Sequence, residues 1–233
     1  LAVGSFIAVL FYLKPIRIKS DYNSWKFLRE SFPMMLSSAI LVVLGWIDTF
    51  ILGIFESDDV VGIYSVSLKI ATLTSFGLQA INSILAPKIS AAYKQEDIIT
   101  FKKLIRFSTR LNFLITLLLI SVIIIFHRYI LEFFGEEFLA GSIILLTLCI
   151  GQVVNSLSGS VGVILQMTGH QKKFKNFVLI ALITNIILNL IFTPIYGAIA
   201  IAVSTVISMA LWNLLGAIYL KKKLNIITYY NFR

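Results

Sequence analysis

Cysteine, histidine and charged side chains are all scarce in this 233-residue sequence. It contains one cysteine and two histidines, and only 13% of its residues are charged. One cysteine excludes a disulfide within the chain, and two isolated histidines give no metal-ligand spacing. The sequence also has no glycine-rich phosphate loop and no Ser/His/Asp set, which nucleotide hydrolysis or hydrolase chemistry would need. We therefore expect no cofactor, no metal site and no enzyme activity from these residues.

Hydrophobic residues take the place of the missing charges. They make up 58% of the sequence, whereas charged residues fall far below the roughly 25% of an ordinary soluble domain. A globule could not bury this much apolar surface, but lipid can cover it. The net charge of +9 lies in short clusters between apolar segments. This pattern is typical of loops that orient membrane helices, and it does not indicate a partner nucleic acid.

Six apolar segments are long enough to cross a bilayer, because about 20 helical residues span its core of about 30 Å. They cover residues 32–55, 60–86, 104–126, 138–166, 177–193 and 197–220. The fourth is long for one span, so we expect it to tilt, to protrude or to break near Gly159. The predicted fold is all-α, a polytopic transmembrane bundle of six full helices.

The remaining segments complete the predicted organisation. Residues 1–13 are apolar but too short to span, and the sequence does not begin with Met, so we interpret them as the end of a truncated transmembrane helix. Residues 14–31 form a basic connector, 32–220 the six-helix bundle, and 221–233 a tail. We expect the chain to be the C-terminal half of a longer protein, with about six further helices upstream in roughly 170–200 residues.

The loop charges predict the orientation of the bundle. Four segments, 14–30, 87–110, 167–175 and 221–233, hold 18 of the 20 Lys and Arg residues. The alternating segments hold only Arg128, together with six acidic residues. By the positive-inside rule the basic segments are cytoplasmic, so both the connector and the C-terminus lie inside a multi-pass cell-membrane protein.

Two charges lie inside the first predicted hairpin. Asp48 and Lys69 sit in neighbouring antiparallel segments at matching depth, about 10–14 Å below the outer surface. Intramembrane ionisable groups usually face a polar interior, where they pair or mark a pathway. The pair is either an ion pair that locks the hairpin or part of the wall of a transport cavity. On a continuous helix Gln79 and Asn82 would extend a polar stripe from Lys69 toward the cytoplasm.

Further polar candidates lie within the apolar segments. Gln152 and Asn155 are spaced i, i+3, and Asn185 and Asn189 are spaced i, i+4, so each pair shares a helix face. Both pairs either line the cavity or form interhelical hydrogen bonds. Near the predicted inner surface Arg106 and Arg110 are one helical turn apart. They either gather an anionic headgroup or set the topology and bind anionic lipid.

Five stretches in order resemble a known family. They are DTFILG from Asp48, VGIYS from Val61 with Lys69 after it, LAP at 85–87, GQVVNSLSGSVGVILQMTGHQK from Gly151, and NIILNLIFTPIYGAIAIAVST from Asn185. Together they make the chain similar to the C-terminal half of polysaccharide flippases of the Wzx/RfbX type, in the multidrug/oligosaccharidyl-lipid/polysaccharide exporter superfamily.

The resemblance implies a transporter of two six-helix bundles around a central cavity. Such a protein flips an undecaprenyl-pyrophosphate-linked oligosaccharide, such as an O-antigen or capsule unit, from the inner to the outer leaflet of the bacterial cell membrane. Its expected partners are this lipid-linked substrate, membrane lipids, and polysaccharide polymerase and assembly proteins. Lys69 matches one of the basic cavity positions of the family.

Three alternatives stay open at this stage. A multidrug-type antiporter of the same superfamily would use Asp48 as a carboxylate linked to protons or sodium. A scaffold subunit of a glycan-assembly complex would need the polar residues only for packing. A membrane-embedded glycosyl or acyl transferase would need a catalytic motif upstream of this chain.

Overall fold

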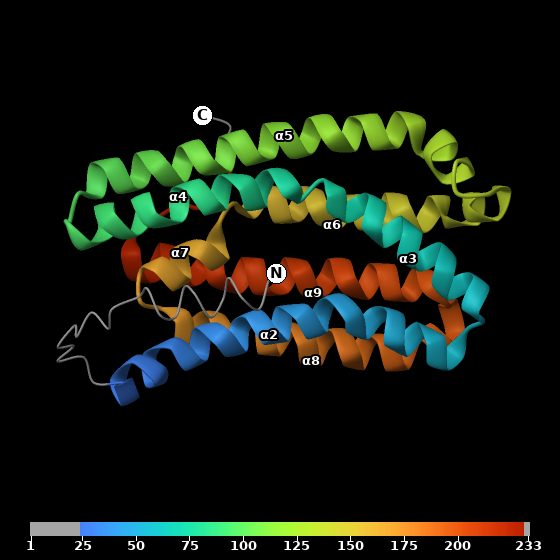
Figure 1. Ribbon diagram of the computed structural model, residues 1–233, viewed down its shortest axis with the longest axis horizontal. Coiled ribbons are helices and arrows are strands. Elements are labelled where there is room, and N and C mark those ends of the chain that lie inside the picture. Colours follow the sequence, from blue (N-terminus) through green and yellow to red (C-terminus); the bar gives the residue numbers. More distant parts are fainter. Residues whose placement is uncertain (1–23, 231–233) are drawn as a thin grey trace, which may run out of the picture. The chain divides into compact units, whose positions relative to one another are not determined.

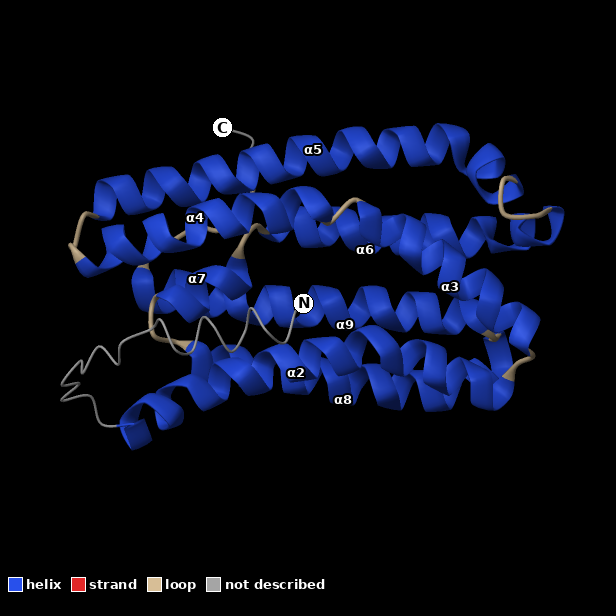
Figure 2. Cartoon of the chain, in the orientation of Figure 1, coloured by secondary structure: helices blue, strands red, loops and turns tan. Residues whose placement is uncertain are grey.

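The computed structural model describes residues 24–230, and every element in this range is a helix (Figure 2). The chain divides into two units, residues 1–32 and 33–233. Of the first unit the structure describes only residues 24–32, which open helix α2. The predicted truncated helix at 1–13 and most of the connector lie outside the described residues.

Nine helical elements make up the described chain, and Figure 1 labels them all except the short η1. Their bounds are α2 Ser24–Phe55, α3 Asp58–Leu73, α4 Phe76–Lys94, α5 Ile98–Glu132, η1 Glu136–Gly141, α6 Ser142–Ser158, α7 Val161–Met167, α8 Gln171–Tyr196 and α9 Ala198–Leu224. The predicted all-α polytopic bundle is confirmed.

Within the described residues, five helices have the length and hydropathy to cross a membrane. A sixth span follows if α3 and α4, which bend by 44° at their junction, count as one. These six agree in order with the six predicted segments. The bounds differ by as much as eight residues, both at the end of α4, which extends to Lys94, and at the start of α2. Because α2 begins at Ser24, it holds Pro33 inside the helix.

Two of the predicted spans are broken. The fourth breaks at Gly159, where the backbone has a φ of +74°, between α6 and α7. The second breaks between Leu73 and Phe76, which the sequence analysis did not predict. Thr74 and Ser75 each donate a side-chain hydroxyl at 2.7 Å to a carbonyl three residues earlier. Such local hydroxyl-to-backbone bonds compete with the helical ladder and favour a bend.

Helix α9 lies at the centre of the packing among residues 33–230. It packs against α8 and α6 most extensively, and also against α7 and α3. Ala200, Ser204 and Ser208 form a buried stripe of small residues along α9. Small residues let helix backbones approach closely where lipid supplies no hydrophobic driving force between helices. The helix can therefore accept neighbours on several sides.

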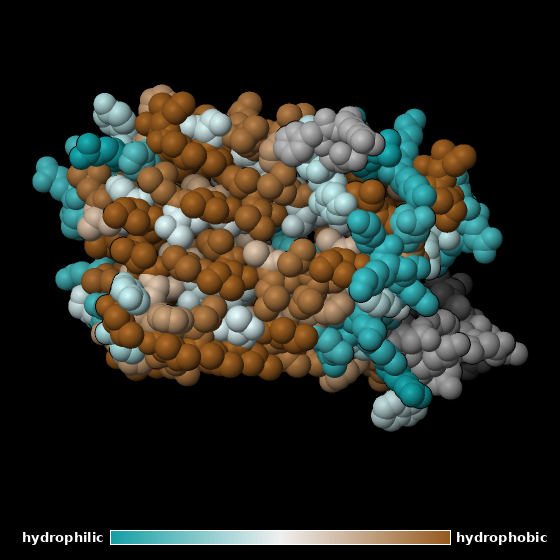
Figure 3. All heavy atoms as spheres, turned by 180° about the vertical axis from the view of Figure 1, so that it is seen from behind, coloured by the Kyte–Doolittle hydropathy of each residue, from teal (hydrophilic) through white to brown (hydrophobic). Residues whose placement is uncertain are grey.

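The outer surface of the bundle is strongly apolar. Large side chains such as Trp46 and Phe50 are about 70% exposed, at 72% and 71%. On the face seen in Figure 3, hydrophobic side chains cover the middle of the helices, while hydrophilic ones gather at the two ends. A surface of this kind is suited to a lipid environment, where apolar side chains face hydrocarbon.

The connections alternate between the two ends of the bundle as the loop charges require. The α4–α5 and α7–α8 connections lie at one end in Figure 1, and the α2–α3, α5–η1 and α8–α9 connections lie at the other. The first end carries the basic loops and the second the acidic turns. Asp97 caps α5 at the basic end by accepting the Thr100 N–H at 3.0 Å. Hydrogen bonding with the Thr100 side chain, and then with this N–H, lowers the pKa of the Asp97 carboxyl.

Candidate functional site

Asp48 is the centre of a polar cluster buried inside the bundle. Its side chain, on α2, is 1% exposed. Asn185 and Asn189 of α8 donate amide N–H groups to its Oδ1, at 3.0 and 2.8 Å. The hydroxyls of Tyr64 on α3, at 3.3 Å, and Thr205 on α9 donate to its Oδ2. We call these five residues the Asp48 cluster, and it joins four helices through one carboxylate.

Helical spacing explains how α8 and α9 bring these donors together. Asn185 and Asn189 lie one turn apart on the buried face of α8, and Asn189 also donates to the Asn185 oxygen at 3.1 Å. Thr205 directly follows Ser204, a member of the small-residue stripe of α9. Because α8 and α9 pack extensively against each other, their amides and the Thr205 hydroxyl reach the same carboxyl group from neighbouring helices.

The chemistry of the Asp48 cluster is that of an anion with neutral partners. Each partner of Asp48 is an amide or a hydroxyl, and none carries a positive charge. The Asn189 Oδ1 oxygen is buried without a hydrogen-bond partner, as is the Thr193 hydroxyl one turn further on. A buried unpaired carboxylate is costly unless a proton or a cation neutralises it. Carboxylate, amide and hydroxyl oxygens are also the hard ligands that small cations prefer.

No cluster of acidic, histidine or cysteine ligands accompanies Asp48 in the described range. Among residues 24–230 there is no group of three or more His, Cys, Asp or Glu side chains that could hold a metal ion. The oxygen-rich surroundings of Asp48 therefore suit a proton or a singly charged cation, which needs fewer anionic ligands than a divalent metal does.

A cavity of about 230 Å³ adjoins the Asp48 cluster. It lies among α2, α3, α6 and α9, and both Asp48 and Thr205 line it. The sequence-predicted pair Gln152 and Asn155 lines the same cavity, so the structure brings these amides to the candidate site. Asn213 of α9 donates to the Asn155 oxygen at 3.1 Å and is itself fully buried. The polar lining thus continues from the carboxylate along α6 and α9.

Lys69 does not pair with Asp48. The α3 residue that reaches Asp48 is Tyr64, five positions before Lys69. Five residues rotate a helix by about 140°, so with Tyr64 facing the carboxylate, Lys69 points to another side of α3. Lys69 is exposed, and its ammonium group has no hydrogen bond or ion pair within residues 24–230. Matching depth in two neighbouring helices was not enough to form the ion pair.

Gln79 and Asn82 lie on α4, beyond the break between α3 and α4. The predicted stripe from Lys69 assumed one continuous helix, and the 44° bend removes that assumption. Gln79 is exposed and hydrogen-bonds Ser75 at 3.4 Å, whereas Asn82 is half-buried with an unpartnered oxygen. Neither residue lines the cavity beside Asp48.

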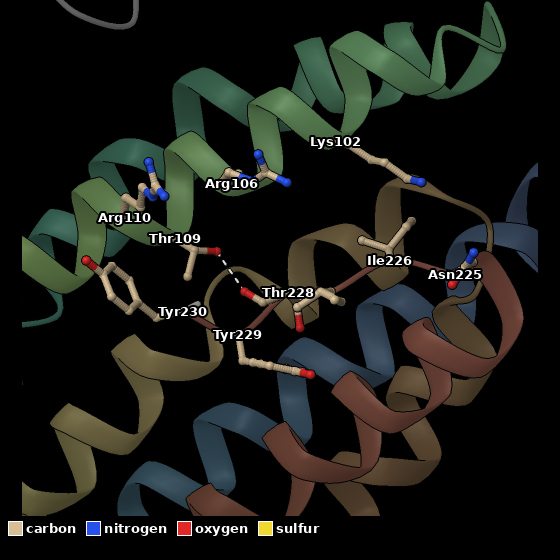
Figure 4. A pocket seen from close by; sticks show the side chains of 10 residues that line it. Lys102, Arg106, Thr109, Arg110, Asn225, Ile226, Thr228, Tyr229 and Tyr230 are labelled. Carbon is tan, nitrogen blue, oxygen red and sulfur yellow. Dashed lines mark hydrogen bonds between the residues drawn. The ribbon is translucent and has the colours of Figure 1, made fainter. Parts of the chain in front are cut away.

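Arg106 and Arg110 lie at a second cavity, near the start of α5. Its volume is about 360 Å³, and its other walls are Lys102, Thr109 and the segment 225–230 that follows α9 (Figure 4). This cavity is at the basic end of the bundle and lies away from the residues of the Asp48 cluster. The eight predicted cavity residues are therefore divided: Asp48, Asn185 and Asn189 form part of the Asp48 cluster, Gln152 and Asn155 line the cavity beside it, and Lys69, Gln79 and Asn82 do neither. The two arginines line a separate cavity.

Sequence reasoning missed three polar residues of the site. Tyr64 and Thr205 donate to Asp48, and Asn213 supports Asn155. Tyr64 and Thr205 both fall inside stretches that carry the family resemblance, so their positions were available as a signal. Asn213 is a lone amide in the apolar run of α9, a placement that favours a buried hydrogen bond.

The fold and the site together define a class of protein. A polytopic helical bundle with a buried carboxyl group, beside a mostly apolar cavity that several amides and hydroxyls also line, has the construction of a membrane transport protein, in which ionisable groups inside the membrane mark substrate or ion pathways.

The comparisons with known proteins place the chain within a family. The MatE family profile matches residues 33–195, and the chain belongs to this family. The chain is 26% identical over 231 residues to "Probable low-salt glycan biosynthesis flippase Agl15" of Haloferax volcanii, an alignment that covers 97% of this chain and 49% of that protein. It is also 26% identical over 180 residues to "Probable flippase AglR" of the same organism, covering 76% of this chain and 38% of that protein.

The family assignment confirms the predicted resemblance to the flippase family. The alignment with Agl15 covers nearly all of this chain, but the chain spans only about half the length of Agl15. No solved structure gave a significant match.

Proposed function

We propose that this chain forms one bundle of a flippase that moves a lipid-linked oligosaccharide across the membrane by alternating access. The observation that carries the proposal is the match to a relative named as a glycan biosynthesis flippase over 97% of the chain. In the finer form predicted from the sequence, the carrier is undecaprenyl pyrophosphate and the direction is from the inner to the outer leaflet. Polysaccharide polymerase and assembly proteins would then take up the product.

The surface charges and cavities of the bundle support this proposal physically. A diphosphate and a sugar chain cannot enter hydrocarbon, whereas a polyprenyl tail can remain there. Lys69 is an exposed cation within a span, and such a group needs water or an anion rather than lipid around it. We assign it the role of contacting the substrate phosphate, while the amides beside Asp48 supply hydrogen bonds. Rocking of two bundles around such a site is the usual form of alternating access.

The Asp48 cluster fits a coupling role in the same transporter. Its carboxylate has only neutral donors, so a proton or a singly charged cation would complete the charge balance. Binding such an ion would change the hydrogen bonds between α2, α3, α8 and α9, which all meet at Asp48. A coupling ion can shift a transporter between conformations only by binding one of them more tightly.

The test is complementation of a strain that lacks the gene. Deletion should abolish glycan at the cell surface, and the wild-type gene should restore it. Lys69→Ala should lower transport about tenfold or more, because one charge-assisted hydrogen bond is worth about 1.5–3 kcal/mol. Asp48→Asn should also fail to restore transport. Lys172→Ala, which removes an exposed lysine that lines neither cavity, is the matched control and should restore it fully.

Variant proteins must insert at wild-type levels for this comparison to count. Intact surface glycan in the deletion strain, combined with sensitivity to cationic dyes, would indicate a multidrug antiporter and contradict the proposal. Full activity of the Asp48→Asn, Lys69→Met double variant would indicate a scaffold, because the two neutral side chains preserve the packing but remove both charges.

A further inference from the structure

The second cavity has a lining of unusual charge. Lys102, Arg106 and Arg110 follow one another at intervals of four residues on α5, so their side chains stack on one side of the helix. Like charges at this spacing repel each other. None of the ten residues that line the cavity is acidic. Lys102 and Arg106 have no hydrogen bond or ion pair within the described residues.

The opposite wall of the cavity is a folded segment, residues 225–230. Asn225 ends α9 in the left-handed conformation, with a φ of +52°, and this turns the chain back toward α5. The Thr109 hydroxyl donates to the Thr228 carbonyl at 2.8 Å, and the Tyr230 N–H donates to the Leu157 carbonyl at 2.9 Å. Two bonds to two different helices therefore hold the segment in place across from the basic face (Figure 4).

Thr228 adds a polar group that no residue in the described range 24–230 satisfies. Its side chain is 1% exposed and lines the cavity, and its hydroxyl oxygen is buried with no hydrogen-bond partner. A buried polar group without a partner costs free energy, so a ligand that bonds it would be favoured. The cavity thus offers cations on one wall, and on the other wall a threonine whose enclosed hydroxyl would reach a ligand after rotation of the side chain.

The place of the cavity along α5 indicates which ligand it suits. Lys102 to Arg110 covers about 12 Å of helix, and a long, mostly apolar part of α5 without charged residues begins directly after Arg110. The cavity therefore lies where a helix passes from the headgroup region into hydrocarbon. Basic pockets at this level bind the phosphates of lipid headgroups, and arginine matches phosphate geometry with paired N–H groups. Its volume of about 360 Å³ is in the range of small-ligand sites.

We propose that this cavity binds the phosphate group of a membrane lipid. Lys102 and Arg106 neutralise the phosphate, and the Thr228 hydroxyl donates a hydrogen bond to one of its oxygens. The segment 225–230 closes the site against α5. The lipid is either an ordinary anionic phospholipid or a polyprenyl diphosphate, which share the same phosphate chemistry. The site is separate from the Asp48 cluster and does not depend on a transport function.

Native mass spectrometry of the purified protein tests this proposal. The probes are phosphatidylglycerol, polyprenyl diphosphate and zwitterionic phosphatidylcholine, each titrated into the detergent-solubilised protein. We expect the two anionic lipids, or one of them, to bind more tightly than phosphatidylcholine. The Lys102→Ala, Arg106→Ala double variant should weaken this binding about tenfold or more, since two charge-assisted contacts are lost. Tighter binding of polyprenyl diphosphate than of phosphatidylglycerol would identify a lipid-linked carrier as the source of the phosphate.

Two further variants test whether lipid binding depends on this cavity or only on basic charge at this end of the bundle. Lys172→Ala with Lys173→Ala removes the same charge from exposed positions at the same end of the bundle, and should leave binding unchanged. Thr228→Val keeps every charge and the backbone carbonyl that Thr109 contacts, yet should weaken anionic-lipid binding several-fold. Equal losses in the two double variants would overturn the proposal. Unchanged binding in Thr228→Val, or no preference for anionic lipids, would also overturn it.

Discussion

At the scale of single residues, the buried carboxylate of Asp48 has the most demanding surroundings in the described chain. Two amides and two hydroxyls from three other helices donate to it. Hydrogen bonds to a charged group are about twice as strong as bonds between neutral groups. The bonds from threonine, asparagine and tyrosine to Asp48 therefore contribute more to holding the helices together than the bonds among these partners do.

A double-mutant cycle should detect this dependence. Thr205→Val removes one donor to Asp48 with little change in volume, and we expect it to lower the free energy of unfolding by about 1–3 kcal/mol. In an Asp48→Asn background the same substitution should cost less, because the charge is gone. Thr147→Val is the matched control, since the Thr147 hydroxyl bonds only the Ile143 carbonyl of its own helix. Thermal or chemical unfolding in detergent measures the free energy of unfolding of the wild type, the two single variants and the double variant. An equal loss from Thr205→Val in both backgrounds would contradict the expectation.

At the scale of helices, breaks decide where side chains meet. The α6–α7 break at Gly159 brings the last turn of α6 against the segment 225–230. A Cβ atom at Gly159 would lie 2.7 Å from the Thr228 carbonyl oxygen and would also contact the Thr109 hydroxyl. Glycine is needed here both for its positive φ and for this close approach. The α3–α4 break comes instead from side-chain hydroxyls, which terminate one helix without glycine or proline.

Alanine substitutions at two glycines should separate the requirement for a positive φ from the requirement for close approach. Gly159 and Gly169 both have positive φ, but a Cβ at Gly169 would have no atom within 4 Å. Both Gly159→Ala and Gly169→Ala carry backbone strain of about 1–3 kcal/mol. Only Gly159→Ala should also loosen the segment 225–230, and chymotrypsin should then cleave faster after Tyr229 or Tyr230. Similar cleavage of the two variants would show that the segment does not depend on close packing at Gly159.

At the scale of the whole molecule, the charge difference between the two ends of the bundle sets its expected orientation. Basic loops share one end and acidic turns the other, as the order of the connections requires. An apolar band lies between the ends on the face that Figure 3 shows. The positive-inside rule then predicts that the basic end, with the end of α9, faces the cytoplasm.

Thiol labelling should test this orientation directly. The natural Cys149 is 1% exposed, and Cys149→Ala, combined with replacement of any cysteine outside this sequence, gives an unlabelled background that serves as the control. In that background Ser57→Cys, in the acidic turn, should react with a membrane-impermeant maleimide in intact cells. Gln95→Cys, between α4 and α5, should react only after the membrane is permeabilised. The reverse pattern would show that the charge rule fails for this protein.

Periodicity and composition were sufficient to predict the all-α membrane bundle and its six spans, and they named a break near Gly159 as one of three alternatives for the long fourth segment. Those features follow from local quantities, such as the length of an apolar run or a glycine within it. The pairs Gln152–Asn155 and Asn185–Asn189 were recognised in the same way, because spacing within one helix determines a shared face. The α3–α4 bend was missed because its hydroxyl bonds resemble ordinary helical threonine and serine in sequence.

The amino-acid sequence alone determined which segments enter the membrane, because burial of apolar side chains in lipid depends on each segment separately. It also determined that Asp48 must find polar partners there. Only the tertiary structure decided which partners these are. The rotation of α3 presents Tyr64 rather than Lys69 to the carboxylate, and the packing of α8 against α9 brings Asn185, Asn189 and Thr205 around it. Contacts between helices depend on how each helix is rotated and how closely it packs, and neither quantity is contained in the spacing of residues along one segment.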